Sequence, residues 1–390
     1  MISVTQALDH LFALASPLEA ETVPLRAASG RVLAHPATAT RNQPPFAASA
    51  MDGYAVNASD VHPGAQFQVI GEAAAGRGFE GAVGPGQAAR IFTGAPMPTG
   101  TDRVVIQEDV TRVDGQITLN ENLDARSYMR PSGADFRVGD RMEAPRQLTP
   151  RDVALLASMN IAEVQVTRRP VVAIIATGDE LVMPGEVPGP DQIIASNGFG
   201  LAAMVEAHGG LARLLPIARD TRASLRTAFD LATGADLIVT IGGASVGDHD
   251  LVGPVAAELG MQRAFYKLAM RPGKPLMAGR MGGSAMIGLP GNPVSTMVCG
   301  HVFILPVLRS MLGLGAAPTP RLTAPLAVDV AANGPREHYM RAALTGNGLT
   351  PAARQDSALL RELARADVLL VRAPNDGPRH AGDVVEYLPL

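Results

Sequence analysis

Carboxylates follow a strongly apolar run near the middle of the chain. The run VVAIIA leads into TGDE at residues 177–180, which places Asp179 and Glu180 at the end of a predicted strand. Glycine opens a turn at such a position, and paired carboxylates are suitable ligands for a hard divalent cation. Acidic turn residues can also simply cap the next element, and this motif alone does not decide between the two interpretations.

A glycine-rich segment, GGASVGDHD at residues 242–250, follows the next apolar run, ADLIVTI. Small residues let backbone N–H groups approach an anion closely, and a following helix N-terminus adds partial positive charge. The spacing matches neither a P-loop nor a dinucleotide-binding fingerprint. A plain glycine-rich connection is the alternative, but the three glycines and two aspartates favour a ligand loop. Its candidate residues are Gly242, Gly243, Ser245, Gly247 and Asp250.

Cations gather in the segment KLAMRPGK, where Lys267, Arg271 and Lys274 lie around a Pro-Gly turn. Runs of charge are usually solvated, but these residues follow a predicted buried strand in a chain of net charge −4. A phosphate or oxyanion site is therefore the better interpretation. In the nearby GLPGNPVS segment we expect Asn292 as N-cap and Pro293 as the first residue of a helix whose N-terminus can hold an anion.

Carboxylates and an anionic ligand at one sheet edge repel each other by roughly 4 kcal/mol per close pair at intermediate dielectric. A divalent cation that bridges them removes this conflict. We therefore predict Mg²⁺ bound between phosphate oxygens and the carboxylates of Glu180, Asp220 and Asp250. Because the eight histidines and the one cysteine form no cluster, a zinc site is not expected, and His249 is interpreted as a loop residue.

The elements that must position these residues belong to a multidomain α/β protein. Strands and helices alternate after residue 169, which predicts a doubly wound parallel sheet that binds ligands at its strand carboxyl ends. The chain of 390 residues is longer than one core usually organises. We expect a helical scaffold or dimerisation domain (1–38 and 139–168), a β-rich insert (39–138), the α/β domain (169–316) and a C-terminal β-barrel or sandwich (317–390). In the scaffold segments, the apolar spacing of Val4, Leu8, Leu11 and Phe12 predicts one helix, and Thr149 and Pro150 suit the N-cap and first turn of another.

Composition excludes several classes of protein. Hydrophobic residues make up 47% of the chain, yet no apolar run reaches the roughly 20 residues of a membrane helix, and the N-terminus does not resemble a signal peptide. The lone Cys299 lies in an apolar helical stretch, where we expect it to pack in a core. A cytoplasmic protein is expected. The net charge of −4 argues against a broad nucleic-acid interface.

Six motifs together resemble the MoeA family of molybdopterin molybdenumtransferases, to which the C-terminal domain of gephyrin and plant Cnx proteins are related. They are SAMDGYA (49–55), FTGAP (92–96), TGDEL (177–181), GGASVG (242–247), RPGKP (271–275) and GLPGNPVS (288–295). Their order and spacing cover nearly the whole chain. The α/β domain is then expected to bind molybdopterin.

The resemblance implies a homodimer of four-domain subunits, with the active cleft between the α/β domain of one subunit and the β insert of the other. Asp52 and Thr93 would be presented across that interface, although both lie in sequences typical of ordinary turns. By similarity, functional weight falls on Asp52, Thr93, Glu180, Asp220, Asp250, Lys267, Arg271, Pro290 and Pro293. Further pocket residues by similarity are Lys274, Ser295, Arg341 and Ser357, the last two in oxyanion binding.

The activity implied is Mg²⁺-dependent insertion of molybdate into adenylylated molybdopterin with release of AMP, the last step of molybdenum cofactor synthesis. Partners would be small-molecule substrates and proteins of the cofactor pathway. A non-catalytic molybdopterin-binding scaffold and a tungstate-specific paralogue are the alternatives. Position 271 is arginine where some family members have lysine, which keeps the charge but replaces a compact ammonium with a planar guanidinium.

Overall fold

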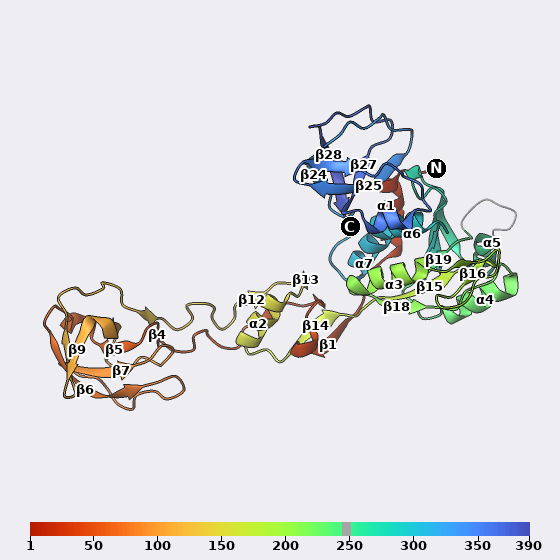
Figure 1. Ribbon diagram of the computed structural model, residues 1–390. Helices are drawn as coiled ribbons and strands as arrows, with labels where there is room; N and C mark the ends of the chain where they lie inside the picture. The colour runs from red at the N-terminus through yellow and green to blue at the C-terminus, as the bar shows by residue number, and fades with distance from the viewer. Residues whose placement is uncertain (244–250) are drawn as a thin grey trace. The chain divides into compact units, whose positions relative to one another are not determined.

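The computed structural model describes residues 1–243 and 251–390, which form two compact units (Figure 1). Unit 1 consists of residues 1–21, 30–34 and 166–390, and unit 2 consists of residues 22–29 and 35–165. The α/β architecture predicted for the second half of the chain is found in unit 1. The β-rich architecture predicted for the insert is found in unit 2.

Unit 1 is built on a six-stranded sheet with the order β18-β15-β19-β23-β22-β20. The strands are β18 (Leu211–Leu214), β15 (Val171–Ala176), β19 (Leu237–Ile241), β23 (Ser284–Leu289), β22 (Met277–Met281) and β20 (Gln262–Tyr266). The first four are parallel, but β22 runs antiparallel to both of its neighbours. The parallel, doubly wound sheet predicted from the sequence is thus found, with β22 as an antiparallel exception. The difference arises because only Gly282 and Gly283 separate β22 from β23, and a two-residue turn forces a hairpin.

Helices cover both faces of this sheet, as the doubly wound prediction requires. One face packs against α1 (Val4–Leu14), α3 (Asn197–Ala207), α6 (Pro293–Cys299) and α7 (Leu305–Met311). The other face packs against α4 (Arg222–Leu231) and α5 (Val252–Glu258). Central strands such as β19 are buried along their whole length, because side chains on both of their faces meet helices.

The N-terminal helix α1 buries Val4, Leu8 and Leu11, as its apolar spacing predicts. It packs into the core of the α/β sheet, whereas the sequence analysis grouped residues 1–38 with the scaffold segment. Cys299 is fully buried, which confirms its core position. The continuous helix Pro293–Met311, with a π-helical turn at Gly300–Ile304, is long and apolar enough to cross a membrane, but 83% of its apolar window is buried inside the protein.

The C-terminal strands of unit 1 form the predicted barrel-like structure. The sheet order is β21-β25-β27-β28-β24. Strand β26 also pairs with β25, outside this order. A bridge between Leu326 and Leu349 brings the end of β24 to β26, which closes the sheet on itself. The strands are β21 (Met270–Arg271), β24 (Leu322–Pro325), β25 (Glu337–Thr345), β26 (Gly348–Pro351), β27 (Val368–Arg372) and β28 (Val384–Pro389); helix α8 spans Leu360–Ala364.

Unit 2 contains a six-stranded sheet with the order β8-β5-β7-β6-β10-β9. Its strands are β8 (Arg103–Ile106), β5 (Gly53–Val56), β7 (Gln87–Ile91), β6 (Gln66–Ala73), β10 (Gln116–Leu119) and β9 (Val110–Val113). Gly53 opens β5 so close to the neighbouring strand that a Cβ atom there would overlap the carbonyl oxygen of Val105. The glycine of the SAMDGYA motif is therefore required by backbone packing.

Helix α2 (Pro150–Ser158) begins as predicted, with Thr149 as N-cap and Pro150 in the first turn. Asp152 completes a capping box that the sequence did not reveal.

The remaining strands are short. One sheet contains β1 (Ala20–Pro24), β2 (Val32–Leu33), β13 (Arg146–Gln147) and β14 (Glu163–Thr167). Three further pairs are β3 (Ala37–Thr38) with β12 (Arg141–Met142), β4 (Ala48–Ser49) with β11 (Met129–Arg130), and β16 (Leu181–Val182) with β17 (Ile193–Ile194).

Candidate active site

A pocket of about 680 Å³ lies at the carboxyl ends of the parallel strands of unit 1. The segments that follow β15, β19 and β23 all contribute to it, in agreement with the general location of ligands in wound sheets. Among the residues predicted for the site, it is lined by Glu180, Asp220, Gly242, Gly243, Pro290 and Pro293. We call it the carboxylate pocket.

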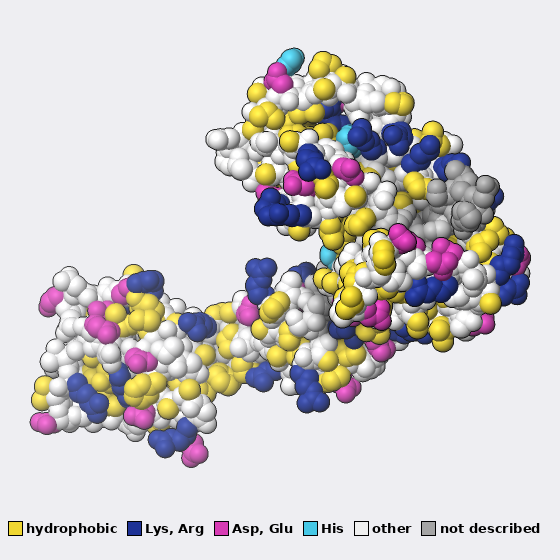
Figure 2. Space-filling view, turned by 45° about the vertical axis from the view of Figure 1, so that its right-hand side comes forward, with side chains coloured by type: hydrophobic (Ala, Val, Ile, Leu, Met, Phe, Trp, Pro, Cys, Tyr) yellow, Lys and Arg dark blue, Asp and Glu magenta, His cyan; other side chains and the backbone are white. Residues whose placement is uncertain are grey.

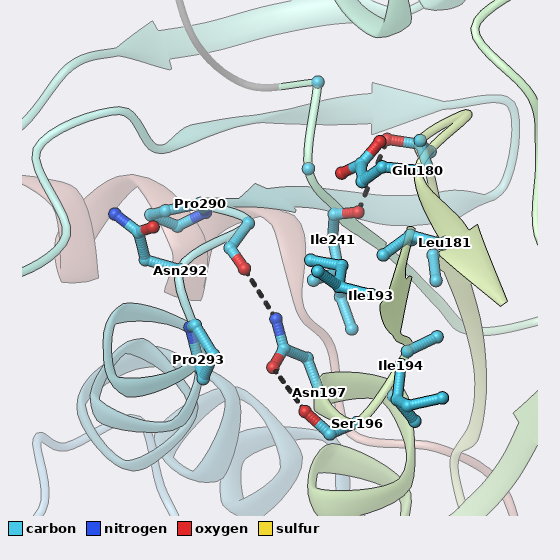
Figure 3. A pocket seen from close by; sticks show the side chains of 18 of the residues that line it. Glu180, Leu181, Ile193, Ile194, Ser196, Asn197, Ile241, Pro290, Asn292 and Pro293 are labelled. Carbon is cyan, nitrogen blue, oxygen red and sulfur yellow. Dashed lines mark hydrogen bonds between the residues drawn. The ribbon is translucent and has the colours of Figure 1, made fainter. Parts of the chain in front are cut away.

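The walls of the carboxylate pocket differ in character (Figure 3). Leu181, Ile193 and Ile194 of the β16–β17 ladder form an apolar side. Across from them lie Pro290, Asn292 and Pro293, with Asn197 between the two sides. The Asn197 amide nitrogen donates a hydrogen bond of 2.6 Å to the Gly291 carbonyl, which ties the start of α3 to the turn before α6. An apolar wall beside polar groups suits a ring system that carries a polar substituent.

Asn292 is the N-cap residue of α6 and Pro293 is its first residue, as predicted. The Asn292 side chain, however, makes no capping hydrogen bond. It lines the pocket instead, which leaves its amide available to a ligand.

Arg219 organises the turn that carries Glu180. Its Nη1 donates hydrogen bonds to the carbonyl oxygens of Gly178 (3.3 Å), Asp179 (3.0 Å) and Leu181 (3.0 Å). The Asp179 carboxylate accepts a hydrogen bond of 3.1 Å from the Asp220 backbone, so the two acidic segments are held together. The sequence analysis did not identify Arg219, because its role depends on contacts made some forty positions away.

Arg219→Ala is expected to lower activity about 100-fold, because the turn would no longer hold Glu180 and a misplacement of about 1 Å can have an effect of this size. Steady-state kinetics beside Arg226→Ala would measure it. Arg226 is also a surface arginine of unit 1, but its guanidinium binds Glu258 away from the pocket. Equal activity of the two variants would show that the Arg219 contacts do not position the turn.

A second pocket, of about 570 Å³, adjoins the first and shares Pro275, Pro290 and Asn292 with it. Its lining includes the predicted residues Arg271, Lys274, Ser295 and Ser357, and also Arg336, Gln355 and Asp356, which the sequence analysis missed. Arg336 immediately precedes β25, whose residue His338 lies opposite Arg271 of β21 in a parallel register. Sheet pairing thus brings together cations more than sixty positions apart. We call this the cation pocket.

The electrostatic potential at the cation pocket is positive. Figure 2 shows Lys and Arg side chains gathered on one face of unit 1. Burial, followed by the charges of Arg271, Arg341, Arg336 and Arg372, lowers the pKa of the His338 imidazole to about 4. No salt bridge involves Arg271, Lys274 or Arg336 within residues 1–243 and 251–390. Their charges are therefore available to an anionic ligand.

The His338 imidazole should make the folded protein less stable in mild acid. The unfolded chain protonates this imidazole below its usual pKa of 6.5, whereas the folded protein keeps it neutral down to about 4. The unfolded state then binds more protons, so stability should fall as the pH decreases from 6.5 to 4. Melting temperatures at pH 7 and pH 5 should differ less in His338→Gln than in the wild type. The same difference in both proteins would contradict the lowered pKa.

The glycine-rich segment enters the carboxylate pocket at Gly242 and Gly243. Both have positive φ, and a Cβ on Gly243 would overlap the side chain of Val252 at the start of α5. Glycine is thus needed for the chain to leave β19 this closely against α5. The predicted site residues Ser245, Gly247 and Asp250 lie outside the described residues.

Two of the predicted cations do not line either pocket. Lys267 has φ +67°, and its ammonium lies 5.1 Å from the centre of the Tyr266 ring, a cation–π contact. Arg341 is completely buried in β25, where its Nη2 donates to the carbonyl oxygens of Arg354 and Asp356. Direct binding of the anion by these two residues therefore receives no support from the pocket geometry.

In unit 2 the two motifs SAMDGYA and FTGAP meet. The Asp52 carboxylate accepts hydrogen bonds from the backbone N–H and the hydroxyl of Thr93, both at 2.8 Å. These hydrogen bonds, with the nearby charge of Arg90, lower the pKa of Asp52. Arg90 also donates to the Gly53 carbonyl and lies over the rings of Tyr54 and Phe92. The pair is thus an ionised carboxylate with a fixed orientation on the surface of unit 2.

The described residues contain no group of three or more His, Cys, Asp or Glu side chains that could hold a metal ion. Of the three predicted magnesium ligands, Glu180 and Asp220 both line the carboxylate pocket. Magnesium in proteins is commonly held by one or two carboxylates together with water and substrate phosphates. The two carboxylates therefore fit a substrate-bridged magnesium ion.

The fold and the paired pockets define an α/β protein with two adjoining pockets at the carboxyl ends of its parallel strands. Three family descriptions match the chain: MoeA N-terminal region (domain I and II) at residues 2–160, probable molybdopterin binding domain at 173–310, and MoeA C-terminal region (domain IV) at 323–390. The chain belongs to the MoeA family, which confirms the resemblance found in the sequence.

Relatives agree with this assignment. Molybdopterin molybdenumtransferases of Nostoc sp. and Haemophilus influenzae are 36% and 37% identical to the chain, covering 87% and 80% of it and 81% and 78% of their own lengths. A crystal structure of a molybdopterin biosynthesis MoeA protein from Pyrococcus horikosii has a TM-score of 0.86 and 29% identity, and covers 100% of this chain and 99% of its own.

Proposed function

We propose that this chain is a molybdopterin molybdenumtransferase that inserts molybdate into the dithiolene of adenylylated molybdopterin and releases AMP. The observation that carries this proposal is the adjacency of the two pockets, which share Pro275, Pro290 and Asn292. One pocket has carboxylates and an apolar wall suited to a nucleotide-linked pterin. The other has three cations suited to a tetrahedral oxyanion.

Adenylylated molybdopterin would lie in the carboxylate pocket, with its pyrophosphate near Gly242 and Gly243. Molybdate would lie in the cation pocket among Arg271, Lys274 and Arg336, with the hydroxyls of Ser295 and Ser357 as hydrogen-bond donors. The two substrates are both anionic, so the cations offset their repulsion and hold them side by side. Placing two reactants in this way contributes several kcal/mol to the lowering of a barrier.

Glu180 and Asp220 would hold magnesium, together with the predicted ligand Asp250 from outside the described residues. When bound, magnesium neutralises charge on the pyrophosphate as its phosphorus–oxygen bond is cleaved. The protein's own contribution at this point is to orient both carboxylates. Arg219 serves that orientation through the carbonyls of the Gly178–Leu181 turn.

We further propose that the active form is a cytoplasmic homodimer in which Asp52 and Thr93 of one subunit complete the site of the other. Support comes from the two motifs themselves, which meet through the Asp52–Thr93 hydrogen bonds on an exposed surface of unit 2. A fixed, ionised carboxylate that its own unit does not use in an ion pair is suited to such a contact. We also propose that each subunit has the four domains expected from the sequence.

Quantifying AMP after mixing purified protein with adenylylated molybdopterin, Mg²⁺ and molybdate tests the activity. Molybdate-dependent AMP release is expected, whereas binding without release would favour a scaffold protein. Competition between molybdate and tungstate in the same assay tests the alternative of a tungstate-specific paralogue. That alternative requires a clear preference for tungstate.

A further inference from the structure

The segment between β26 and α8 forms a wall of both pockets. Gln355, Asp356 and Ser357 line the cation pocket, and Ala358 lines the carboxylate pocket. This segment begins where β26 ends at Pro351, and the last backbone bond to β25 is the one that the Ala352 N–H donates to the Arg341 carbonyl at 2.8 Å. Beyond Ala352 the position of the segment must be fixed by other contacts. We call residues 352–358 the wall loop.

The Gln355 side chain continues the contact with β25 after Ala352. Its Oε1 accepts a hydrogen bond from the Arg341 backbone N–H at 3.1 Å, and its Nε2 donates to the Arg341 carbonyl at 2.9 Å. The same Nε2 donates to the Ala352 carbonyl at 2.9 Å. One amide group thus bonds both backbone groups of a strand residue, as a paired strand would, while it also closes the loop on itself.

The Arg341 side chain holds the loop from the interior. It is completely buried, and its Nη2 donates to the carbonyls of Arg354 and Asp356, both at 3.0 Å. No salt bridge to Arg341 is formed by any of the described residues. A charge taken out of water in this way is costly, and charge-assisted bonds to carbonyls are what compensate for it here.

The far end of the wall loop is joined to α6. The backbone N–H of Val294 donates to the Ser357 carbonyl at 3.0 Å, and Asp356 accepts from the Ala358 backbone at 2.9 Å. Ser357 therefore lies between two anchors, one on β25 and the other on the helix that carries Ser295. Both anchors therefore bear on the position of Ser357 in the cation pocket.

We propose that Gln355 and Arg341 are positioning residues that hold Ser357 at the cation pocket, with Arg341 acting from behind the wall rather than as a ligand of the anion. The identity of that anion as molybdate rests on the proposed function. The placement of the loop does not, because it follows from hydrogen bonds within the ligand-free protein.

Gln355→Met tests this inference, because methionine has a similar length and cannot form the amide hydrogen bonds. The matched control is Gln68→Met, which removes an exposed amide bonded to the Gly115 carbonyl in unit 2. In the ligand-free full-length protein, hydrogen exchange of residues 352–358 and of Val294 is expected to speed up about tenfold in Gln355→Met only, since two or three hydrogen bonds are lost. Unchanged hydrogen exchange of the wall loop in Gln355→Met would overturn the proposed role of Gln355.

The second measurement is kinetic. In AMP release by the intact protein, Gln355→Met should raise the KM for molybdate about tenfold and change kcat less than about threefold. A proportional loss of kcat without a change in KM would overturn the positioning role in anion binding. Failure of the wild type to release AMP would reject the proposed function instead, while the exchange measurement would still decide whether Gln355 holds the loop.

Discussion

Glu180→Gln is expected to reduce molybdate-dependent AMP release by about three orders of magnitude while the protein remains folded. The substitution keeps the size of the side chain but removes the negative charge that would hold magnesium against the pyrophosphate. Loss of a single electrostatic contact of this kind typically lowers kcat by about 10² to 10³. Single-turnover measurement of AMP, with enzyme in excess, would separate this step from substrate binding and product release.

A matched control for this variant is Glu186→Gln. Glu186 lies six positions further along, outside the carboxylate pocket, and its carboxylate accepts a hydrogen bond from the Met183 backbone. Its replacement should leave the rate within about twofold of the wild type, as for most surface substitutions. Comparable rates for Glu180→Gln and Glu186→Gln would remove Glu180 from the mechanism.

Mixing two inactive variants should restore activity if the site is shared between subunits. Asp52→Ala and Glu180→Ala are each expected to be inactive alone. A heterodimer of the two contains one site without either substitution and one site with both. Random exchange of subunits at equal concentrations should therefore recover about a quarter of the wild-type activity, because half of the dimers are mixed.

The measurement is AMP release after denaturation and joint refolding of the two variants, beside each variant refolded alone. If Asp52 instead acted on its own subunit's site, every subunit would carry one lesion and the mixture would remain inactive. If the protein were a monomer, the same absence of recovery would be seen. A size measurement on the refolded mixture distinguishes these two cases.

The periodicity and turn signals of the sequence predicted much of the fold. The apolar spacing of Val4, Leu8 and Leu11 and the Thr149-Pro150 pair located two helices correctly. The antiparallel β22 departs from the predicted parallel sheet because Gly282-Gly283 forms a two-residue hairpin turn between β22 and β23.

Sheet topology alone is enough to bring together the residues that directly follow strands of the α/β sheet. Glu180, Gly242 and Pro290 lie at one edge because parallel strands end together, and this required no knowledge of side-chain contacts. Arg336 and Gln355 reach the cation pocket through the pairing of β21 with β25 and the course of the wall loop. Such long-range contacts leave no local pattern in the sequence.

Arg341 shows the limit of transferring a role by resemblance alone. The resemblance implied a role for Arg341 in oxyanion binding, but its side chain is buried in the interior and bonds the carbonyls of the wall loop. In a strand, neighbouring side chains point to opposite faces, so a shift of one position decides between ligand and support.

A crystal of the full-length protein soaked with molybdate and AMP provides the most direct test of the central claim that the two pockets hold two anions side by side. The anomalous signal of molybdenum should lie among Arg271, Lys274, Arg336 and Ser357, with AMP in the adjoining pocket near Glu180 and Asp220. Molybdate bound away from these cations, or AMP bound at a site that is not continuous with it, would contradict the account.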